Sequence, residues 1–188
     1  MRLRNSGNSY AMSYKDGLRI AISGCSGCGN STVSRILAKR LNLNLVNYTF
    51  RSIAVEDSIS FEEVCKRAET ESKYDLRVDR TQVALARKSP SVLGSRLAIW
   101  LLEEADIKVF LKGSLEARTR RIRQREGGSM ENLLNATALR DMRDHERYRK
   151  LYGIDNYDYS QADLVVDTDD LNASQVVDII EEAVRKFG

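Results

Sequence analysis

Apolar residues along this chain follow two patterns, short unbroken runs and longer stretches in which they recur every three or four positions. The short runs are typical of buried strands, and the longer stretches are typical of amphipathic helices. Because the two patterns alternate, they predict an α/β fold with a five-stranded parallel sheet flanked by helices. Strands are predicted over 18–23, 43–47, 91–93, 107–111 and 164–166.

The helical stretches begin and end at recognisable residues. The first covers 33–41 and follows a glycine-rich turn. Ser60 and Glu63 have the spacing of a capping box, which predicts the start of an amphipathic helix. Gly127 and Gly128 separate two later helices. Further helices are predicted over about 74–88, 114–126, 129–151 and 172–187.

The length of 188 residues fits one domain. Residues 1–16 are polar, rich in serine and asparagine and without period, so we expect a flexible N-terminal extension. Residues 17–188 are expected to form a single domain, in which the arginine-rich segment at about 113–151 acts as a lid on the sheet. With 42% hydrophobic and 30% charged residues, the chain can build a packed core, which excludes wholesale disorder.

Composition narrows the classes of function. Three cysteines and the lack of a leader argue against a secreted disulfide framework, so a cytoplasmic protein is expected. No apolar run approaches the ~20 residues that cross a bilayer, which excludes a membrane protein. The net charge of +3 is too small to require nucleic acid as a partner. The expected partners are small molecules, and the expected oligomeric state is a monomer.

A candidate phosphate-binding loop, GCSGCGNST at 24–32, fits the pattern G-x-x-x-x-G-x-[S/T] between a predicted strand and a predicted helix. In this setting backbone N–H groups converge on a phosphate, and the helix start adds roughly half a positive charge. The Ser31 hydroxyl is expected to face a magnesium ion. An ordinary glycine-rich turn is the less favoured interpretation. The expected phosphate ligands are Gly24, Ser26, Gly27, Cys28, Gly29, Asn30, Ser31 and Thr32.

Asn30 departs from the usual sequence of such phosphate-binding loops. It stands where such loops carry a lysine that reaches the β- and γ-phosphates. Either another cation replaces that lysine, or the protein binds nucleotide without efficient turnover. Cys25 and Cys28 also form a C-x-x-C pair, but no second pair accompanies them, so a metal or redox site is disfavoured.

Five arginines lie between positions 118 and 125. Arg118, Arg121 and Arg125 are spaced i, i+3 and i+7 and therefore share one helix face, which favours a polyphosphate ligand. Arg120 and Arg123 are rotated away from that face. For these two, a solvated basic surface is the better interpretation.

Two further groups of arginines are candidates. Arg140, Asp144 and Arg147 share a face of the predicted helix 129–151, which places a carboxylate between two guanidinium groups. Spacing alone would equally suit a surface ladder of ion pairs. Arg51 and Arg96 follow the second and third predicted strands, and the carboxyl ends of parallel strands open onto the ligand crevice.

Six segments, in this order, resemble the cytidylate kinases, and most closely the short archaeal-type branch of these P-loop nucleoside monophosphate kinases. The likeness covers nearly everything from Leu18 onward. It implies a P-loop fold and transfer of the γ-phosphoryl group of ATP to CMP or dCMP with magnesium. The segments are GCSGCGNST at 24–32, Phe50-Arg51, R-L-A-x-W at 96–100, the arginine-rich segment with five arginines at 118–125, R-D-M-R-D-H-E-R at 140–147 and Y-G-I-D at 152–155.

The resemblance also implies roles for the candidate residues. Asp144 would accept a hydrogen bond from the exocyclic amine of cytosine, which uracil lacks. Arg118 would lie over the adenine of ATP, and Arg121, Arg125 and the Asn30 position would act on the transferring phosphoryl group. The CMP-binding residues would be Arg51, Arg96, Arg140, Asp144 and Arg147.

The third predicted strand departs from the family pattern. The family usually has an acidic residue and a glycine before the arginine, whereas this chain has Gly94-Ser95-Arg96. With Asn30, this change leaves room for a pseudokinase that binds nucleotide without efficient transfer. Another small-molecule P-loop kinase is a second alternative. An RNA-binding protein is a third, and the low net charge weighs against it.

Overall fold

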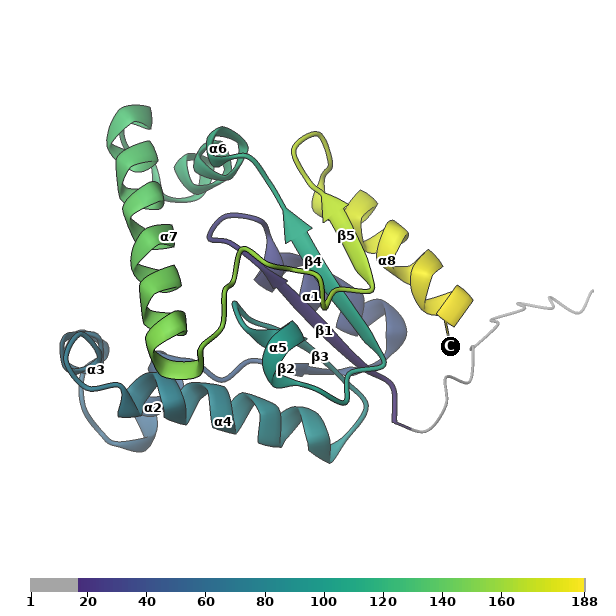
Figure 1. The fold of residues 1–188 in the computed structure, drawn as a ribbon, viewed down its shortest axis with the longest axis horizontal. Helices are drawn as coiled ribbons and strands as arrows, with labels where there is room; N and C mark the ends of the chain where they lie inside the picture. The colour runs from purple at the N-terminus through teal and green to yellow at the C-terminus, as the bar shows by residue number, and fades with distance from the viewer. Residues whose placement is uncertain (1–16, 188) are drawn as a thin grey trace, which may run out of the picture.

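The computed structural model describes residues 17–187, and its centre is a five-stranded parallel sheet (Figure 1). The strand order is β2-β3-β1-β4-β5, and every neighbouring pair is parallel. The predicted fold class is therefore confirmed, whereas the prediction for residues 1–16 lies outside the described part. The strands are β1 (Arg19–Gly24), β2 (Asn44–Val46), β3 (Ser91–Gly94), β4 (Ile107–Lys112) and β5 (Leu164–Asp167).

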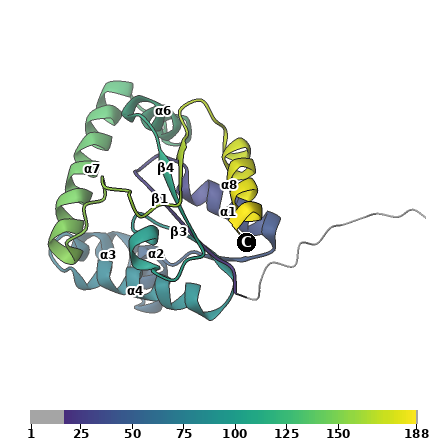
Figure 2. The same ribbon diagram turned by 45° about the vertical axis from the view of Figure 1, so that its right-hand side comes forward.

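Helices cover both faces of the sheet (Figure 2). Helices α1 (Asn30–Leu41) and α8 (Ala173–Phe187) pack on one face, and α4 (Lys73–Lys88) and α5 (Ala98–Leu101) pack on the other. Among residues 17–187, no helix has the length and apolar character needed to span a bilayer. The remaining helices are α2 (Phe50–Glu56), α3 (Phe61–Ala68), α6 (Leu115–Glu126) and α7 (Met130–Tyr152).

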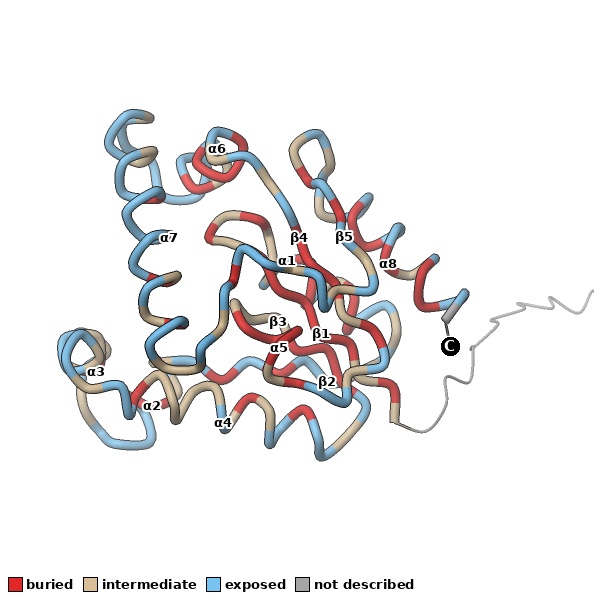
Figure 3. The backbone as a smooth tube through the Cα atoms, viewed as in Figure 1, coloured by how far each residue is buried: buried red, intermediate tan, exposed pale blue. Residues whose placement is uncertain are grey.

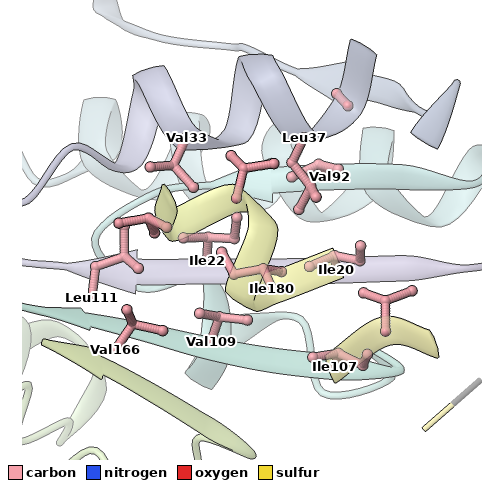
Figure 4. Close-up of a cluster of buried hydrophobic side chains, with 14 of the residues drawn as sticks. Ile20, Ile22, Val33, Leu37, Val92, Ile107, Val109, Leu111, Val166 and Ile180 are labelled. Carbon is pink, nitrogen blue, oxygen red and sulfur yellow. The ribbon is translucent and has the colours of Figure 1, made fainter. Parts of the chain in front are cut away.

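The core is built from alternating strand residues, because successive side chains of a strand point to opposite faces. Ile20 and Ile22 of β1 pack under α1 and α8, where Figure 4 shows them beside Val33 and Leu37. Ala21 points to the opposite face and packs under α5. Buried residues accordingly concentrate in the central strands, and α6 and α7 carry long exposed surfaces (Figure 3).

Two helices are absent from the sequence-based prediction, α2 and α5, and both are short. Helix α2 begins with a reciprocal cap, in which the Thr49 hydroxyl accepts from the Arg51 N–H and the Ser52 hydroxyl accepts from the Thr49 N–H. A serine at the third helical position is a weaker sequence signal than the glutamate or glutamine of the usual motif. The cap of α2 therefore could not be recognised from the sequence pattern.

The capping box predicted at Ser60 is only half formed. The Ser60 hydroxyl accepts from the Glu63 N–H at 3.1 Å, as expected. The Glu63 carboxylate, however, accepts from Arg67 at 2.6 Å, one turn further along α3. An ion pair with a guanidinium thus replaces the expected return bond to the Ser60 backbone.

Candidate active site

The glycine-rich loop connects β1 to α1 at the carboxyl end of the sheet, as predicted. Two of its glycines are required by close packing. A Cβ on Gly24 would lie 2.5 Å from the carbonyl oxygen of Leu111, and a Cβ on Gly27 would lie 2.8 Å from that of Arg118. Both residues also have positive φ angles, which favour glycine. The loop backbone is therefore held against β4 and α6.

Asn30 is the first residue of α1, so the helix starts three positions earlier than the predicted start at residue 33. Its side-chain amide donates to the carbonyl oxygen of Gly24 at 2.9 Å, which closes the loop on itself. The Asn30 Oδ1 atom is buried and has no hydrogen-bond partner among the described residues. The preceding Gly29 provides no side-chain cap, which leaves the helix N-terminus open to an anion.

The two loop cysteines do not form a reactive site. Cys28 is buried in the apolar cluster under α1, and burial raises the pKa of its thiol to about 12. Burial also raises the pKa of Cys25. Within the described residues, no cluster of His, Cys, Asp and Glu is suited to hold a metal ion. The Cys28 N–H donates to the Cys25 carbonyl at 3.2 Å, inside the loop.

Two adjoining cavities lie at this end of the sheet. The loop cavity, of about 630 Å³, is bounded by residues 25–27 and 29–32 and by Arg121 and Arg125 of α6. The α4 cavity, of about 570 Å³, is bounded by α2, α4 and the start of α3. Gln82, Ser95 and Arg96 line both cavities. The arrangement can hold two ligands with Arg96 at their junction.

Arg96 and Arg147 are joined by one buried carboxylate. Arg96 donates to one oxygen of Asp144, and Arg147 donates to the other at 2.9 Å. Asp144 is only 6% exposed. The structure therefore places Asp144 between two guanidinium groups, as expected, but the second one comes from Arg96 and not from Arg140.

Arg140 lies elsewhere because of the direction of side chains on a helix. Helical side chains point towards the helix N-terminus, so Arg147 reaches back to Asp144 while Arg140 points away from it. The Arg140 guanidinium instead donates to the hydroxyl of Ser26, at 3.3 Å. Arg140 is thus placed at the glycine-rich loop.

Arg118 is buried between the loop and α7. Its guanidinium donates to the carbonyl oxygens of Ser26 and Gly113, each at 3.0 Å, and to the Asp141 carboxylate at 2.7 Å. With 6% of its surface exposed, it braces the loop and offers little area to an adenine ring. The predicted position of Arg118 over the adenine of ATP stays a prediction.

Arg121 and Arg125 lie on the loop-cavity side of α6, as the spacing predicts. Arg121 donates to the hydroxyl and to the carbonyl oxygen of Thr168, which follows β5. Arg125 is exposed, and its ion-pair partner is Glu126. Arg120 and Arg123 are exposed as well, in agreement with the expectation of a solvated surface.

Arg51 lies in the first turn of α2 and lines the α4 cavity. Its guanidinium carbon is 4.2 Å from the centre of the Phe61 ring, which is a cation–π contact between α2 and α3. Phe61 lines the same cavity. The aromatic ring therefore fixes the arginine at the wall of the cavity.

Helix α4 supplies polar residues that the sequence reading missed. Asp75, Asp79 and Gln82 all line the α4 cavity. Burial raises the pKa of Asp79 to about 6, and its carboxylate accepts from the Tyr152 hydroxyl at 2.5 Å. The available signal was the four-residue spacing of the two aspartates on one face of the helix.

Comparison with solved structures identifies the fold. The chain resembles shikimate kinase from Bacteroides thetaiotaomicron, with a TM-score of 0.61 and 17% identity over 89% of this chain and 98% of that one. It also resembles deoxyadenosine kinase from M. mycoides, with a TM-score of 0.52 and 19% identity over 89% and 100% of the chains. At these identities the likeness shows the fold, which is that of a P-loop kinase.

The chain belongs to the cytidylate kinase-like family, whose model matches residues 19–170. It is 41% identical to cytidylate kinase 2 of Borreliella burgdorferi over 173 residues, which cover 90% of this chain and 96% of that protein. It is 37% identical to cytidylate kinase of Pyrococcus horikoshii over 172 residues, 90% of each chain. The resemblance stated from the sequence is thereby confirmed.

Proposed function

We propose that this chain is a nucleoside monophosphate kinase that transfers the γ-phosphoryl group of ATP to CMP or dCMP, giving ADP and CDP or dCDP. The observation that carries the proposal is the pair of adjoining cavities that share Arg96. One cavity has a phosphate-binding loop, and the other has arginines from α2, from the turn after β3 and from α7. Relatives that bear the name cytidylate kinase support the choice of substrate.

The donor nucleotide fits the loop cavity. Backbone N–H groups of residues 24–32 and the open start of α1 suit its phosphates, which carry the negative charge that a helix N-terminus favours. Arg140 lies beside Ser26 and adds a cation at the loop. Arg118 holds the loop in place through Ser26 and Asp141. In this arrangement Arg118 is a positioning residue, and its predicted contact with adenine would use the face of the guanidinium plane.

A magnesium ion would fit beside Ser31. The Ser31 side chain is exposed and lines the loop cavity, and no carboxylate among the described residues lines that cavity. Magnesium is commonly held by few protein oxygens together with phosphate oxygens of the substrate. When bound, the ion would offset negative charge on the phosphates. Ser31 is the residue of this chain that would hold it.

The acceptor nucleotide fits the α4 cavity. Arg51 and Arg96 would bind its phosphate, and Arg147, bound with Arg96 to Asp144, adds a third cation. Asp144 accepts from both guanidinium groups, so it orients them and offsets their repulsion. Its predicted role as the acceptor of the cytosine amine remains a prediction.

Phosphoryl transfer needs alignment and charge stabilisation more than covalent help from the protein. An oxygen of the CMP phosphate attacks the γ-phosphorus atom, the bond to the β-phosphate oxygen breaks, and ADP leaves. Arg96 lies where the two cavities meet, and Arg121 and Arg125 face the loop cavity. These arginines would supply the positive charge that a P-loop lysine provides elsewhere, while the Asn30 amide keeps the loop closed.

A coupled assay of ADP release with CMP, dCMP, UMP, AMP and shikimate as acceptors tests the proposal. We expect ADP release that depends on CMP or dCMP and exceeds the rate without an acceptor. Tight ATP binding without acceptor-dependent release of ADP would indicate the pseudokinase, for which the asparagine at position 30 leaves room. A preference for shikimate or AMP would identify another P-loop kinase and overturn the proposal.

Arg96→Ala tests the acceptor site. We expect a higher KM for CMP and a lower kcat, because the variant loses a charged contact to the acceptor phosphate. Arg35→Ala is a control on α1, since Arg35 is exposed and does not line the α4 cavity. Kinetics equal to those of the wild type would show that Arg96 has no role in acceptor binding.

A further inference from the structure

The α4 cavity contains one carboxylate without a hydrogen-bond donor. Asp75 lies in the first turn of α4, and its side chain is 12% exposed. Its Oδ2 atom is buried and has no hydrogen-bond partner among the described residues. The ion-pair contact of its Oδ1 atom is with Arg147 Nε at 3.6 Å, which is too long for a hydrogen bond.

The other carboxylates of this region are already engaged. Asp79, which also lines the cavity, accepts from Tyr152. Asp144 accepts from Arg96 and Arg147 and is not part of the cavity wall. Asp75 is therefore the carboxylate in the cavity wall that is placed to accept a hydrogen bond from a ligand.

A donor without a partner lies next to this acceptor. Arg147 lines the same cavity, and its Nε–H is buried and makes no hydrogen bond with the described residues. Leaving a buried donor and a buried acceptor unpaired is costly, so such groups in a native structure commonly await a ligand or water. Together the Asp75 carboxylate and the Arg147 Nε–H form a polar edge of the α4 cavity, with one hydrogen-bond acceptor and one donor.

We propose that the Asp75 carboxylate accepts the exocyclic amine of the acceptor base, while Arg147 Nε–H donates to the adjacent ring nitrogen or carbonyl oxygen. The inference rests on the proposed function and names the residue that selects the base. Cytosine offers an amine beside the unprotonated N3, whereas uracil offers a carbonyl oxygen beside N3–H. The edge therefore favours CMP over UMP.

The electrostatics of Asp75 agree with this role. Burial raises the pKa of its carboxyl group, the positive charge of Arg147 lowers it, and Asp144 raises it. A hydrogen bond donated by a ligand favours the charged form of a carboxyl group. A bound amine would thus compensate the charge that burial penalises.

A binding experiment without ATP tests the contact directly. CMP is compared by calorimetry with the monophosphate of pyrimidin-2-one riboside, which lacks the amine and keeps N3 and O2. In the wild type, loss of the amine should weaken binding by about 10- to 100-fold, the range for a hydrogen bond to a charged group. In Asp75→Ala, loss of the amine should have no further effect.

Two results of this experiment would overturn the inference. One is equal affinity of the wild-type protein for both ligands, a result that does not depend on the folding of any variant. The other is a penalty in Asp75→Ala as large as in the wild type. Asp178→Asn on α8, where Asp178 pairs with Arg40, is the control for loss of a surface carboxylate.

Steady-state kinetics distinguish the role of Asp75 from the role of Asp144. Asp75→Asn keeps the shape of the side chain but adds an amide donor that suits the O4 atom of uracil, so the ratio of kcat/KM for CMP and UMP should fall at least ~10-fold. Asp144→Asn should lower kcat/KM for both nucleotides and keep their ratio, because it disturbs Arg96 and Arg147. A changed ratio in Asp144→Asn and an unchanged one in Asp75→Asn would assign base selection to Asp144.

The kinetic and binding arms also distinguish this inference from the proposed function. Adenine presents the same amine beside a ring nitrogen, so AMP is included as a further ligand. A wild-type preference for AMP, or no ADP release with CMP, would overturn the proposed function even if Asp75 accepts a hydrogen bond from the amine of the base. Normal CMP kinase activity with an unchanged base preference in Asp75→Asn would overturn only the inference.

Discussion

Ser34 occupies the space that a side chain at Gly94 would need. A Cβ on Gly94, at the end of β3, would lie 2.1 Å from Ser34 Oγ and 2.8 Å from Ser34 Cβ on α1. Ser34 is 1% exposed, and its hydroxyl has no hydrogen-bond partner among the described residues. The position at which the family usually carries an acidic residue is thus closed to any side chain in this protein.

Gly94→Ala should therefore destabilise the fold. Overpacking of a closed site costs about 1–3 kcal/mol, which corresponds to a Tm lower by about 2–12 °C for a domain of this size. In a Ser34→Gly background the same substitution should cost much less, because both clashing atoms are gone. Thermal unfolding of the wild type, the two single variants and the double variant measures this coupling. Equal costs of Gly94→Ala in both backgrounds would contradict the steric argument.

The regular elements could be predicted from the sequence because their signals are local. All five strands and the long helix α7 follow from hydrophobic period and from capping residues such as Ser114 and Ser129, whose hydroxyls cap α6 and α7. Short helices carry weaker signals, because the seven residues of α2 make about two helical turns and the four of α5 only about one. Local pattern therefore predicts the scaffold better than its connections.

The pairing of the charged residues could not be predicted from the sequence. Arg96 and Asp144 are 48 residues apart, and only the fold brings the turn after β3 into contact with α7. Spacing correctly placed Asp144 beside Arg147, but it could not show that Arg140 turns towards Ser26. The sequence alone suggests that Asp75 is a surface residue of an amphipathic helix, and only the structure shows that it lines the α4 cavity. Chemistry that depends on long-range contacts thus requires the structure.

Asp79 makes stability depend on pH. Its pKa is about 6 in the folded protein, against about 4 for an unperturbed aspartate, so the folded state binds this proton more tightly than the unfolded state. The cost of burying its charge is present above pH 6 and is lost as the pH falls from 6 to 4. Asp79→Asn should then be more stable than the wild type at pH 8, by up to about 3 kcal/mol.

The measurement is the difference in Tm between Asp79→Asn and the wild type at pH 8 and at pH 4.5. The asparagine can still accept from Tyr152, so the hydrogen bond is not the variable. The difference should shrink towards zero at the lower pH. Asp178→Asn on the surface of α8 controls for general charge effects. A stability difference that does not change with pH would show that burial of Asp79 is not the cause.

Asn30→Asp tests the closure of the glycine-rich loop. The substitution keeps the shape of the side chain but removes the amide that donates to Gly24, and it sets a carboxylate against a carbonyl oxygen and the phosphates. ATP affinity should fall at least ~10-fold, with a lower Tm. Asn30→Lys should be tolerated and should bind ATP at least as tightly as the wild type. Calorimetry that finds wild-type ATP affinity in Asn30→Asp would exclude this role of the amide.

Arg121 and Arg125 should act mainly in the transition state, because the loop has no lysine and other cations must offset the charge on the transferring group. Replacement of either by alanine should lower kcat by at least ~10²-fold, while ATP affinity changes less. Arg121→Ala should also lower the Tm, since Arg121 donates to Thr168. Arg125→Ala should leave the Tm unchanged, because Arg125 is exposed and its ion-pair partner is its neighbour Glu126.

The same helix offers the matched controls. Arg120 and Arg123 are exposed and do not line the loop cavity, so their replacement by alanine removes an equal charge from α6 without touching that cavity. We expect both variants to retain wild-type kcat. If all four variants lowered kcat equally, the effect would come from the total charge of the helix. If none did, the charge on the transferring phosphoryl group would have to be met by Arg96 and Arg140, the other arginines at the loop and at the cavity junction.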